Sequence, residues 1–263
     1  MHKKMEAILS RVQKPARYVG GEWGSVMKNR EEVDLRFAFC FPDVYEVGMS
    51  HLGSRILYGL LNDQPGVWCE RVCAPWVDME DELRSAGIPL YALESGDPLH
   101  LFDIIGFTLQ YELSFTNILN MLDLGGIPVL AAERKALSHL VVCGGPCAYN
   151  PEPLADFVDV FLIGDGEEVM LEFTDLYRQA KRESWDKPRF LHQAASIPGV
   201  YVPALYEVRY HEDGTVESVA PIDGAPAKVQ KRIVEDLDTM YYPESFVVPS
   251  TDIVFDRAMV ELF

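Results

Sequence analysis

The feature that most constrains the fold is a short apolar run that recurs along the chain, each time followed by a helical pattern. Leu35 to Phe41 and Leu140 to Cys143 are nearly continuous apolar runs, typical of strands covered on both faces. Strands that alternate with helices are joined by crossover connections, which favour parallel pairing. We therefore predict an α/β fold with a doubly wound parallel sheet of about five strands. The other runs interpreted as strands are 67–73, 90–93, 103–108 and 160–163.

The two ends of the sequence lack this alternation of strand and helix patterns. Residues 1–32 are predicted to form an N-terminal arm, because glycines at 20, 21 and 24 interrupt any regular element. After residue 185 the alternation stops, and Asp213-Gly214 lies between two β-like runs, which predicts a β-hairpin. Seven prolines between Pro188 and Pro249 favour extended chain, so residues 186–255 are interpreted as a hairpin and linker appendage.

Composition narrows the function classes. The chain has 23 basic and 41 acidic residues, a net charge of -18, which argues against nucleic acid and anionic membrane surfaces as partners. No apolar run is long enough for a transmembrane helix, and the first residues lack the apolar core of an export signal. Five cysteines, an odd number, favour thiols over a disulfide framework. We expect a cytoplasmic protein.

The cysteines include two C-x3-C pairs, which raise the question of a metal. Cys69 and Cys143 are embedded in apolar strand runs, where cysteine usually packs as a small apolar residue. A cluster of the radical S-adenosylmethionine type needs C-x3-C-x2-C, and Trp76 and Asn150 occupy the third positions here. We therefore expect no metal ligands and no such cluster in this chain, and we assign no catalytic residue.

In open α/β sheets, ligands bind outside the carboxyl ends of the strands. Those loops contain no G-x-G-x-x-G and no P-loop motif. Gly164 to Glu168 resembles a phosphate cradle, but its three carboxylates would repel phosphate. We interpret Asp165 as the N-cap of a helix whose dipole favours Glu167 and Glu168.

His51 follows the first strand. It is a candidate axial metal ligand, a hydrogen-bonding loop residue or a helix-start residue, and the structural roles are favoured for a lone histidine. No Ser/His/Asp or Cys/His arrangement can be placed from the sequence, so hydrolytic catalysis is unsupported.

Several loops are recognisable together. Phe41 to Ser50, Gly144-Gly145-Pro146 with Asn150 to Pro153, and Gly164 to Glu168 resemble the N-terminal part of a largely uncharacterised bacterial family of radical SAM proteins with a cobalamin-binding domain. The final residues, 256–263, resemble the first strand of that family's radical SAM barrel. The resemblance covers nearly the whole chain.

The resemblance implies a flavodoxin-like, cobalamin-binding-type domain over residues 33–185. It also implies a partner in cis, a radical SAM barrel with its [4Fe-4S] cluster and S-adenosylmethionine, which this chain does not contain. The corrin would lie across the carboxyl ends of the strands. The residues that the resemblance implies for cofactor binding are Val44, Tyr45, Glu46, Gly48, Met49, Ser50, His51, Gly144, Gly145, Pro146, Gly164 and Gly166.

One departure from the pattern concerns His51. Cobalamin domains that use histidine as the lower ligand carry D-x-H-x-x-G, whereas Met49 lies two residues before His51 and Asp43 lies eight residues before it. Two hypotheses therefore stand: an accessory domain of a radical SAM enzyme, and a cofactor-free binding or scaffold domain. A flavodoxin-like flavin or nucleotide protein is a third, weaker one.

Overall fold

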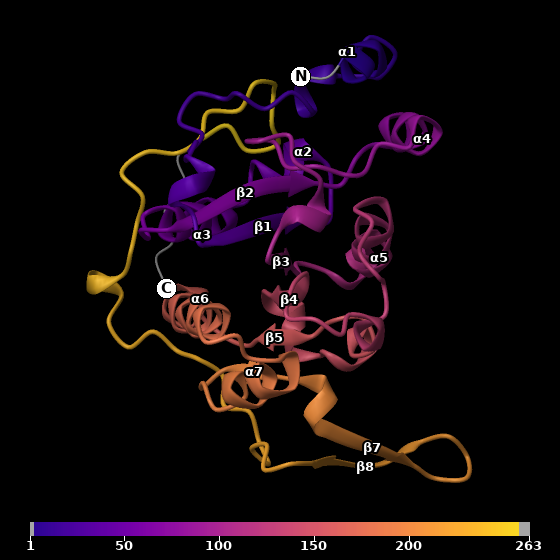
Figure 1. The fold of residues 1–263 in the computed structure, drawn as a ribbon, viewed down its shortest axis with the longest axis vertical. Coiled ribbons are helices and arrows are strands. Elements are labelled where there is room, and N and C mark those ends of the chain that lie inside the picture. Colours follow the sequence, from indigo (N-terminus) through magenta and orange to yellow (C-terminus); the bar gives the residue numbers. More distant parts are fainter. Residues whose placement is uncertain (1–2, 258–263) are drawn as a thin grey trace.

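The fold is centred on one sheet, seen in a computed structural model that describes residues 3–257 (Figure 1). Within these residues the sheet has six strands in the order β2-β1-β3-β4-β5-β6. The first five pair in parallel and β6 is antiparallel to β5. This confirms the predicted α/β class, and the order 2-1-3-4-5 is that of flavodoxin-like sheets. The strands are β1 (Leu35–Phe41), β2 (Val67–Cys73), β3 (Ile104–Thr108), β4 (Leu140–Gly144), β5 (Val160–Leu162) and β6 (Val200–Tyr201).

Helices cover both faces of the sheet, α3 and α6 on the left of Figure 1 and α4 and α5 on the right. A hydrophobic core lies on each face of the sheet, and alternate residues of β1 point into one or the other. Phe37 packs toward α3 and α6, and Cys40 packs toward α4 and α5. This two-sided burial explains why the strands appear in the sequence as continuous apolar runs. The helices are α1 (Lys3–Leu9), α2 (Tyr45–Gly48), α3 (Leu52–Asn62), α4 (Val77–Ala86), α5 (Phe115–Leu124), α6 (Gly166–Arg182) and α7 (Lys187–Ala194). Short 3-10 turns are η1 (Pro15–Arg17), η2 (Arg30–Glu32), η3 (Leu99–Leu101), η4 (Glu112–Ser114), η5 (Ala131–Glu133), η6 (Pro146–Tyr149), η7 (Glu152–Leu154), η8 (Pro203–Leu205) and η9 (Leu237–Thr239).

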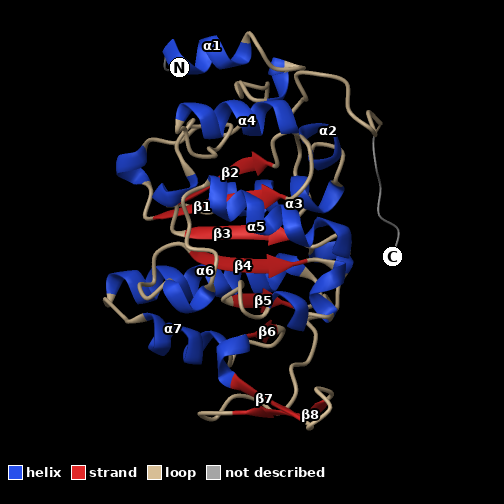
Figure 2. Cartoon of the chain, turned by 90° about the vertical axis from the view of Figure 1, so that its right-hand side faces the viewer, coloured by secondary structure: helices blue, strands red, loops and turns tan. Residues whose placement is uncertain are grey.

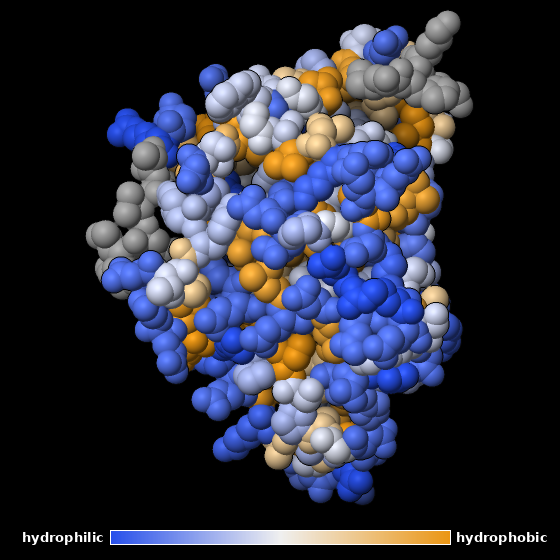
Figure 3. Space-filling model, turned by 60° about the vertical axis from the view of Figure 1, so that its left-hand side comes forward, coloured by the Kyte–Doolittle hydropathy of each residue, from blue (hydrophilic) through white to orange (hydrophobic). Residues whose placement is uncertain are grey.

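The surface agrees with the acidic composition. Figure 3 brings forward the side of the molecule that carries α3 and α6, where hydrophilic residues cover most of the surface and hydrophobic ones form separate patches. None of the helices in the described part of the chain combines the length and the apolar character needed to cross a membrane.

Two details of the sheet differ from the prediction. Residues 90–93 do not form a strand: Tyr91 makes only an isolated bridge with Pro98, because Ala92 closes a tight turn by donating to the Asp97 carbonyl. The α/β unit also continues past residue 185, through α7 and β6, into the segment assigned to the appendage. Asp186 caps α7 by accepting from the Arg189 amide at 2.9 Å, a local signal that the prolines obscured.

The two ends of the described chain pack on this core. Helix α1 of the predicted N-terminal arm buries Met5 and Ile8 beside α4. The predicted hairpin is present as β7 (Tyr206–Tyr210) and β8 (Val216–Pro221), turning at Asp213-Gly214 (Figure 2). Beyond it, the chain returns along the molecule to the level of α2, as the yellow segment of Figure 1 shows. The strand predicted at 256–263 lies largely outside the described residues.

The outer edge of β2 is occupied by side chains and a loop. Asn62 bonds both backbone groups of Cys69, accepting from its amide at 3.0 Å and donating to its carbonyl at 2.9 Å. At Arg71 the amide donates to Glu94 at 2.7 Å and the carbonyl accepts from the Leu93 amide at 2.8 Å. The outward-facing backbone groups of Cys69 and Arg71, in the middle of this edge strand, are therefore satisfied within the chain.

Candidate functional site: a cleft at the carboxyl ends of the strands

A cleft of about 760 Å³ opens at the carboxyl ends of β1, β3, β4 and β5, toward which the arrowheads in Figure 2 point. The strand order reverses between β1 and β3, so this is the switch point where doubly wound sheets bind ligands. Its floor is apolar, formed by Phe37, Phe39, Val142 and Met170. A volume of this size, with an apolar floor and a polar rim, is typical of a small-molecule site.

The residues implied by the resemblance fall into three groups. Six of them line the cleft: His51, Gly144, Gly145, Pro146, Gly164 and Gly166. Gly48 and Met49 line a second, smaller cavity on the other side of α3. The remaining four, Val44, Tyr45, Glu46 and Ser50, line neither cavity.

Three of those four bind segments near the two ends of the described residues. The Tyr45 hydroxyl donates to Glu22 at 2.9 Å and accepts from the Ser250 amide at 3.1 Å. The Ser50 hydroxyl accepts from the Phe255 amide at 3.0 Å. Residues 45–50, which comprise α2 and the turn after it, thus bind segments far away in the sequence.

Glu46 is the third of these residues. Its Oε1 accepts from Lys14 at 2.9 Å and from Arg17 at 2.8 Å. Burial opposes ionisation of this carboxyl group, but the hydrogen bonds from Arg17 and Lys14 outweigh it and lower the pKa of Glu46. Glu46 therefore binds the N-terminal arm as a carboxylate.

Two cleft glycines are needed by the chain's own packing. Gly164 has φ +104°, and a Cβ there would lie 2.0 Å from the Arg232 carbonyl oxygen. Gly145 has φ +98°, and its Cβ would lie 3.0 Å from both the amide nitrogen and the carbonyl oxygen of Leu109. Gly144 differs, since its Cβ would meet nothing closer than 3.6 Å. Of these three, Gly144 alone has room toward the cleft.

The acidic turn at 164–168 has a different role from the one predicted. Asp165 occupies the N-cap position of α6, but its side chain makes no capping hydrogen bond and instead accepts from the Val234 amide at 2.7 Å. Glu168 pairs with Arg232 at 2.6 Å. Arg232 and Val234, which follow the hairpin, therefore bind these two carboxylates, and Asp165 does not cap the helix. Glu167 lines the cleft.

His51 starts helix α3. Its Nδ1 accepts from the Ser54 amide at 3.0 Å, and the ring lies against Phe41 with centroids 5.5 Å apart. Burial lowers the pKa of His51, and a hydrogen bond with Gln110 opposes the shift only in part. The imidazole is therefore neutral near pH 7. Since Nδ1 accepts, the proton is assigned to Nε2, which leaves that nitrogen no lone pair for a metal.

Replacing His51 with alanine is expected to lower the free energy of unfolding by about 1 kcal/mol at pH 7, because α3 loses its N-cap. The pKa of His51 is lower in the folded protein than in the unfolded chain. The stability that the neutral His51 side chain contributes is therefore complete above the usual pKa of 6.5, and it is lost as the pH falls through the folded pKa. Urea unfolding from pH 7.5 to pH 5 measures both effects. His211→Ala, in the exposed hairpin turn, is the control; an unchanged pH dependence in His51→Ala would contradict the assignment.

The structure confirms that Cys69 and Cys143 are core residues. Cys69 and Cys143 are fully buried, and burial raises the pKa of both thiols, so they remain protonated. Among residues 3–257, no group of three or more His, Cys, Asp or Glu side chains is placed to hold a metal ion.

Sequence reasoning missed several residues of the cleft wall. Thr108 is the last residue of β3 and Gln110 lies two residues after it; the Gln110 amide donates to the Thr108 hydroxyl. Their position at the end of a central strand was a usable signal. It also missed the second cavity, whose arginines 55 and 71 carry charges in largely apolar stretches.

The parallel sheet order and the open cleft at its switch point define a doubly wound, flavodoxin-like α/β domain. The chain matches the model of the family described as radical SAM proteins, N-terminal, over residues 53–203, more than half of its length, and it belongs to that family. It is also similar to an uncharacterized protein of Methanocaldococcus jannaschii, with 30% identity over 139 residues, covering 51% of this chain and 25% of that protein. The chain thus spans about a quarter of that relative's length. No solved structure matches it.

Proposed function

We propose that this chain is the accessory domain that precedes a radical SAM barrel, and that its cleft binds a corrinoid without a histidine ligand. In this proposal the barrel would carry the iron-sulfur cluster and bind S-adenosylmethionine. Membership of the family supports the accessory role. The observation that carries the ligand proposal is the cleft of about 760 Å³ at the switch point of the sheet.

The residues of the cleft are compatible with this ligand. Phe37, Phe39 and Met170 offer an apolar floor for the face of a macrocycle, and Thr108 and Gln110 offer hydrogen bonds to peripheral amides. The bound corrinoid would supply cobalt-centred radical chemistry. Because Nδ1 of His51 is used by Ser54, the cobalt would not be ligated by this histidine.

Titration with hydroxocobalamin tests the proposal. After free ligand is removed by gel filtration, the chain should retain a visible corrinoid spectrum, and His51→Ala should retain the same spectrum. Gly144→Leu should lose binding, because Gly144 lies on the same face of β4 as Val142 and its new side chain would enter the cleft. This variant is preferable to a change at Gly145, because a side chain at the positive φ of that residue would strain the backbone.

Ala132→Leu, which adds the same side chain at an exposed position in η5, is the matched control and should bind like the parent. A different spectrum in His51→Ala would show that the histidine ligates after all. Equal retention by Gly144→Leu would place the ligand elsewhere.

A second candidate function is a cofactor-free scaffold domain. The observation that favours it is that Tyr45, Glu46 and Ser50, at the most recognisable motif, bind the chain's own segments. This candidate predicts that the folded parent retains no corrinoid in the same titration.

A further inference from the structure

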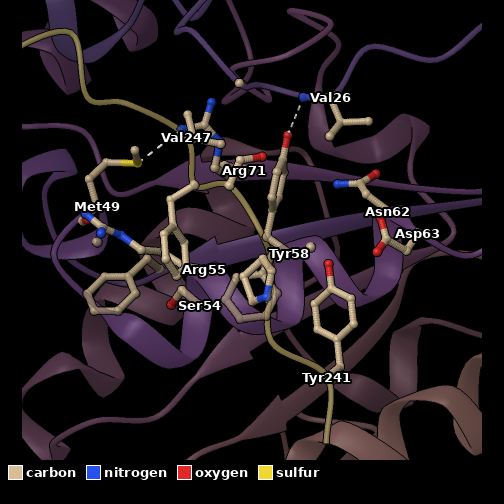
Figure 4. Close-up of a pocket in the computed structure, with 18 of the residues that line it drawn as sticks. Val26, Met49, Ser54, Arg55, Tyr58, Asn62, Asp63, Arg71, Tyr241 and Val247 are labelled. Carbon is tan, nitrogen blue, oxygen red and sulfur yellow. Dashed lines mark hydrogen bonds between the residues drawn. The ribbon is translucent and has the colours of Figure 1, made fainter. Parts of the chain in front are cut away.

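The second cavity, here called the α3 chamber, has a volume of about 430 Å³ (Figure 4). It lies between α3, the carboxyl ends of β1 and β2, and the returning segment 241–247. Helix α3 lies between it and the cleft: Leu57 lines only the cleft, whereas Arg55 and Tyr58 line only the chamber. Phe39 and Ser54 line both, so the two cavities adjoin. The chamber therefore adjoins the cleft but has its own arginines and its own cover, the segment 241–247.

The returning segment forms a roof over the chamber. Tyr241 reaches across α3 at Gly59, where a Cβ would lie 2.7 Å from the Tyr241 hydroxyl oxygen. Beyond the roof, the Val248 amide donates to the Trp23 carbonyl at 2.9 Å. The segment is thus held against the protein on both sides of the chamber, and it covers the space without filling it.

The two arginines of the chamber differ in how their charge is balanced. Arg71 is paired with Glu22 at 2.9 Å and with Glu94 at 2.6 Å. Arg55 donates through Nε to the Met49 carbonyl at 2.9 Å and lies 5.6 Å from the centre of the Phe246 ring. It makes no ion pair with any carboxylate of the described residues, although the protein is strongly acidic.

Arg55 is half-buried, and burial lowers its pKa although the nearby Tyr242 opposes the shift, as expected for a charge that has lost water without pairing with a carboxylate. The acidic residues of the chamber do not supply that anion. Asp63 hydrogen-bonds with Tyr241, and Glu244 is exposed. One positive charge is therefore left inside a partly enclosed space.

The walls beside this charge are aromatic. Tyr58 and Tyr241 extend into the chamber in Figure 4, and Phe39, Phe41 and Phe246 also line it. Aromatic side chains pack favourably on flat rings. An arginine beside them supplies charge-assisted hydrogen bonds to a carboxylate or phosphate.

We propose that the α3 chamber is a binding site for a small planar anion, a carboxylate or phosphate carried on an aromatic ring. Arg55 binds the anionic group, and the aromatic side chains pack against the ring. This site is independent of the corrinoid proposed for the cleft, so either can fail without the other.

Isothermal titration of the chain with phenyl phosphate, benzoate and neutral benzyl alcohol tests the proposal. Both anions should bind more tightly than benzyl alcohol by about 10- to 100-fold, the factor expected for hydrogen bonds to a charged group. The ranking of the two anions distinguishes a phosphate site from a carboxylate site. Equal affinity for all three compounds, or no binding at millimolar concentration, would overturn the proposal.

Variants and a local probe place the binding. Arg55→Gln should lose the preference for anions and Arg55→Lys should keep part of it. Arg189→Gln should have no effect, because that arginine stacks on Trp185 away from the chamber. In protein labelled with 13C at the methionine methyl groups, phenyl phosphate should shift Met49, which lines the chamber, and leave the core residue Met121 unchanged. A shift confined to other methionines would place the ligand elsewhere, whether or not Arg55→Gln folds.

Discussion

Replacing Arg71 with methionine is expected to lower the free energy of unfolding by about 3 to 5 kcal/mol at pH 7. Arg71 is 9% exposed and pairs with two carboxylates, Glu22 and Glu94, that are 5% and 9% exposed. Methionine fills a similar volume but leaves both carboxylates buried without their partner. Urea unfolding of parent and variant at pH 7 measures the loss.

The pH dependence identifies the cause. In the parent, burial opposes ionisation of Glu22, but Arg71 outweighs it and lowers the pKa of Glu22, so this contribution is lost as the pH falls through the folded pKa, below 4.5. Without Arg71, burial raises that pKa above its unfolded value. The variant should therefore regain stability relative to the parent as the pH falls from 7 toward 4.5. A deficit that stays constant over this range would contradict the explanation.

Two control variants separate charge from packing. Arg84→Met removes an arginine from surface pairs with Glu80 and Asp123 and should cost at most about 1 kcal/mol. The triple variant Glu22→Gln, Arg71→Met, Glu94→Gln has no unpaired charge and should be more stable at pH 7 than Arg71→Met alone.

Replacing Asp159 with asparagine should have an effect of similar size, about 3 to 5 kcal/mol at pH 7. Asp159 is 4% exposed, and its carboxylate accepts from Lys187 at 2.6 Å and pairs with Arg134 at 3.0 Å. It also accepts from the Val141 amide at 2.8 Å, so it links the start of β4 to α7. Asparagine keeps the shape but leaves two buried cations without their counterion. Urea unfolding at pH 7 measures the loss.

The pH dependence should run in the opposite direction to that of Arg71→Met. Burial already lowers the pKa of Lys187, against the attraction of Asp159. Without Asp159 the folded protein releases this proton more readily than the unfolded chain, whose lysine has a pKa near 10.5. The variant should therefore regain stability as the pH rises from 7 toward 10. The control is Asp175→Asn, which removes a surface pair with Arg178; a deficit that does not shrink at alkaline pH would count against the buried network.

Much of the fold could be predicted because local signals and long-range packing agree. The run Leu35 to Phe41 is apolar on both faces because both faces of β1 are covered. The Asp213-Gly214 turn is specified by its own residues: Gly214 adopts φ +83°, and Asp213 accepts from the Thr215 amide at 3.0 Å. Such features need no knowledge of distant contacts.

The cleft could be located but not described in detail. The switch-point rule brings the loops after β1, β4 and β5 together. It could not show that the Tyr45 hydroxyl binds the amide of Ser250, 205 positions away, because a contact at that separation leaves no periodic pattern. The glycine at 164 indicated a close approach, but the sequence could not reveal that Arg232 of the same chain is what approaches.

The bonded outer edge of β2 has a consequence for how copies of this chain meet. An edge strand with unpaired amides and carbonyls is a template on which another strand can add, and it promotes aggregation. Here Asn62, Glu94 and the Leu93 amide already occupy the outward groups of Cys69 and Arg71. A second molecule would have to displace these bonds before it could extend the sheet. The same side chains that complete the fold thus discourage edge-to-edge polymerisation.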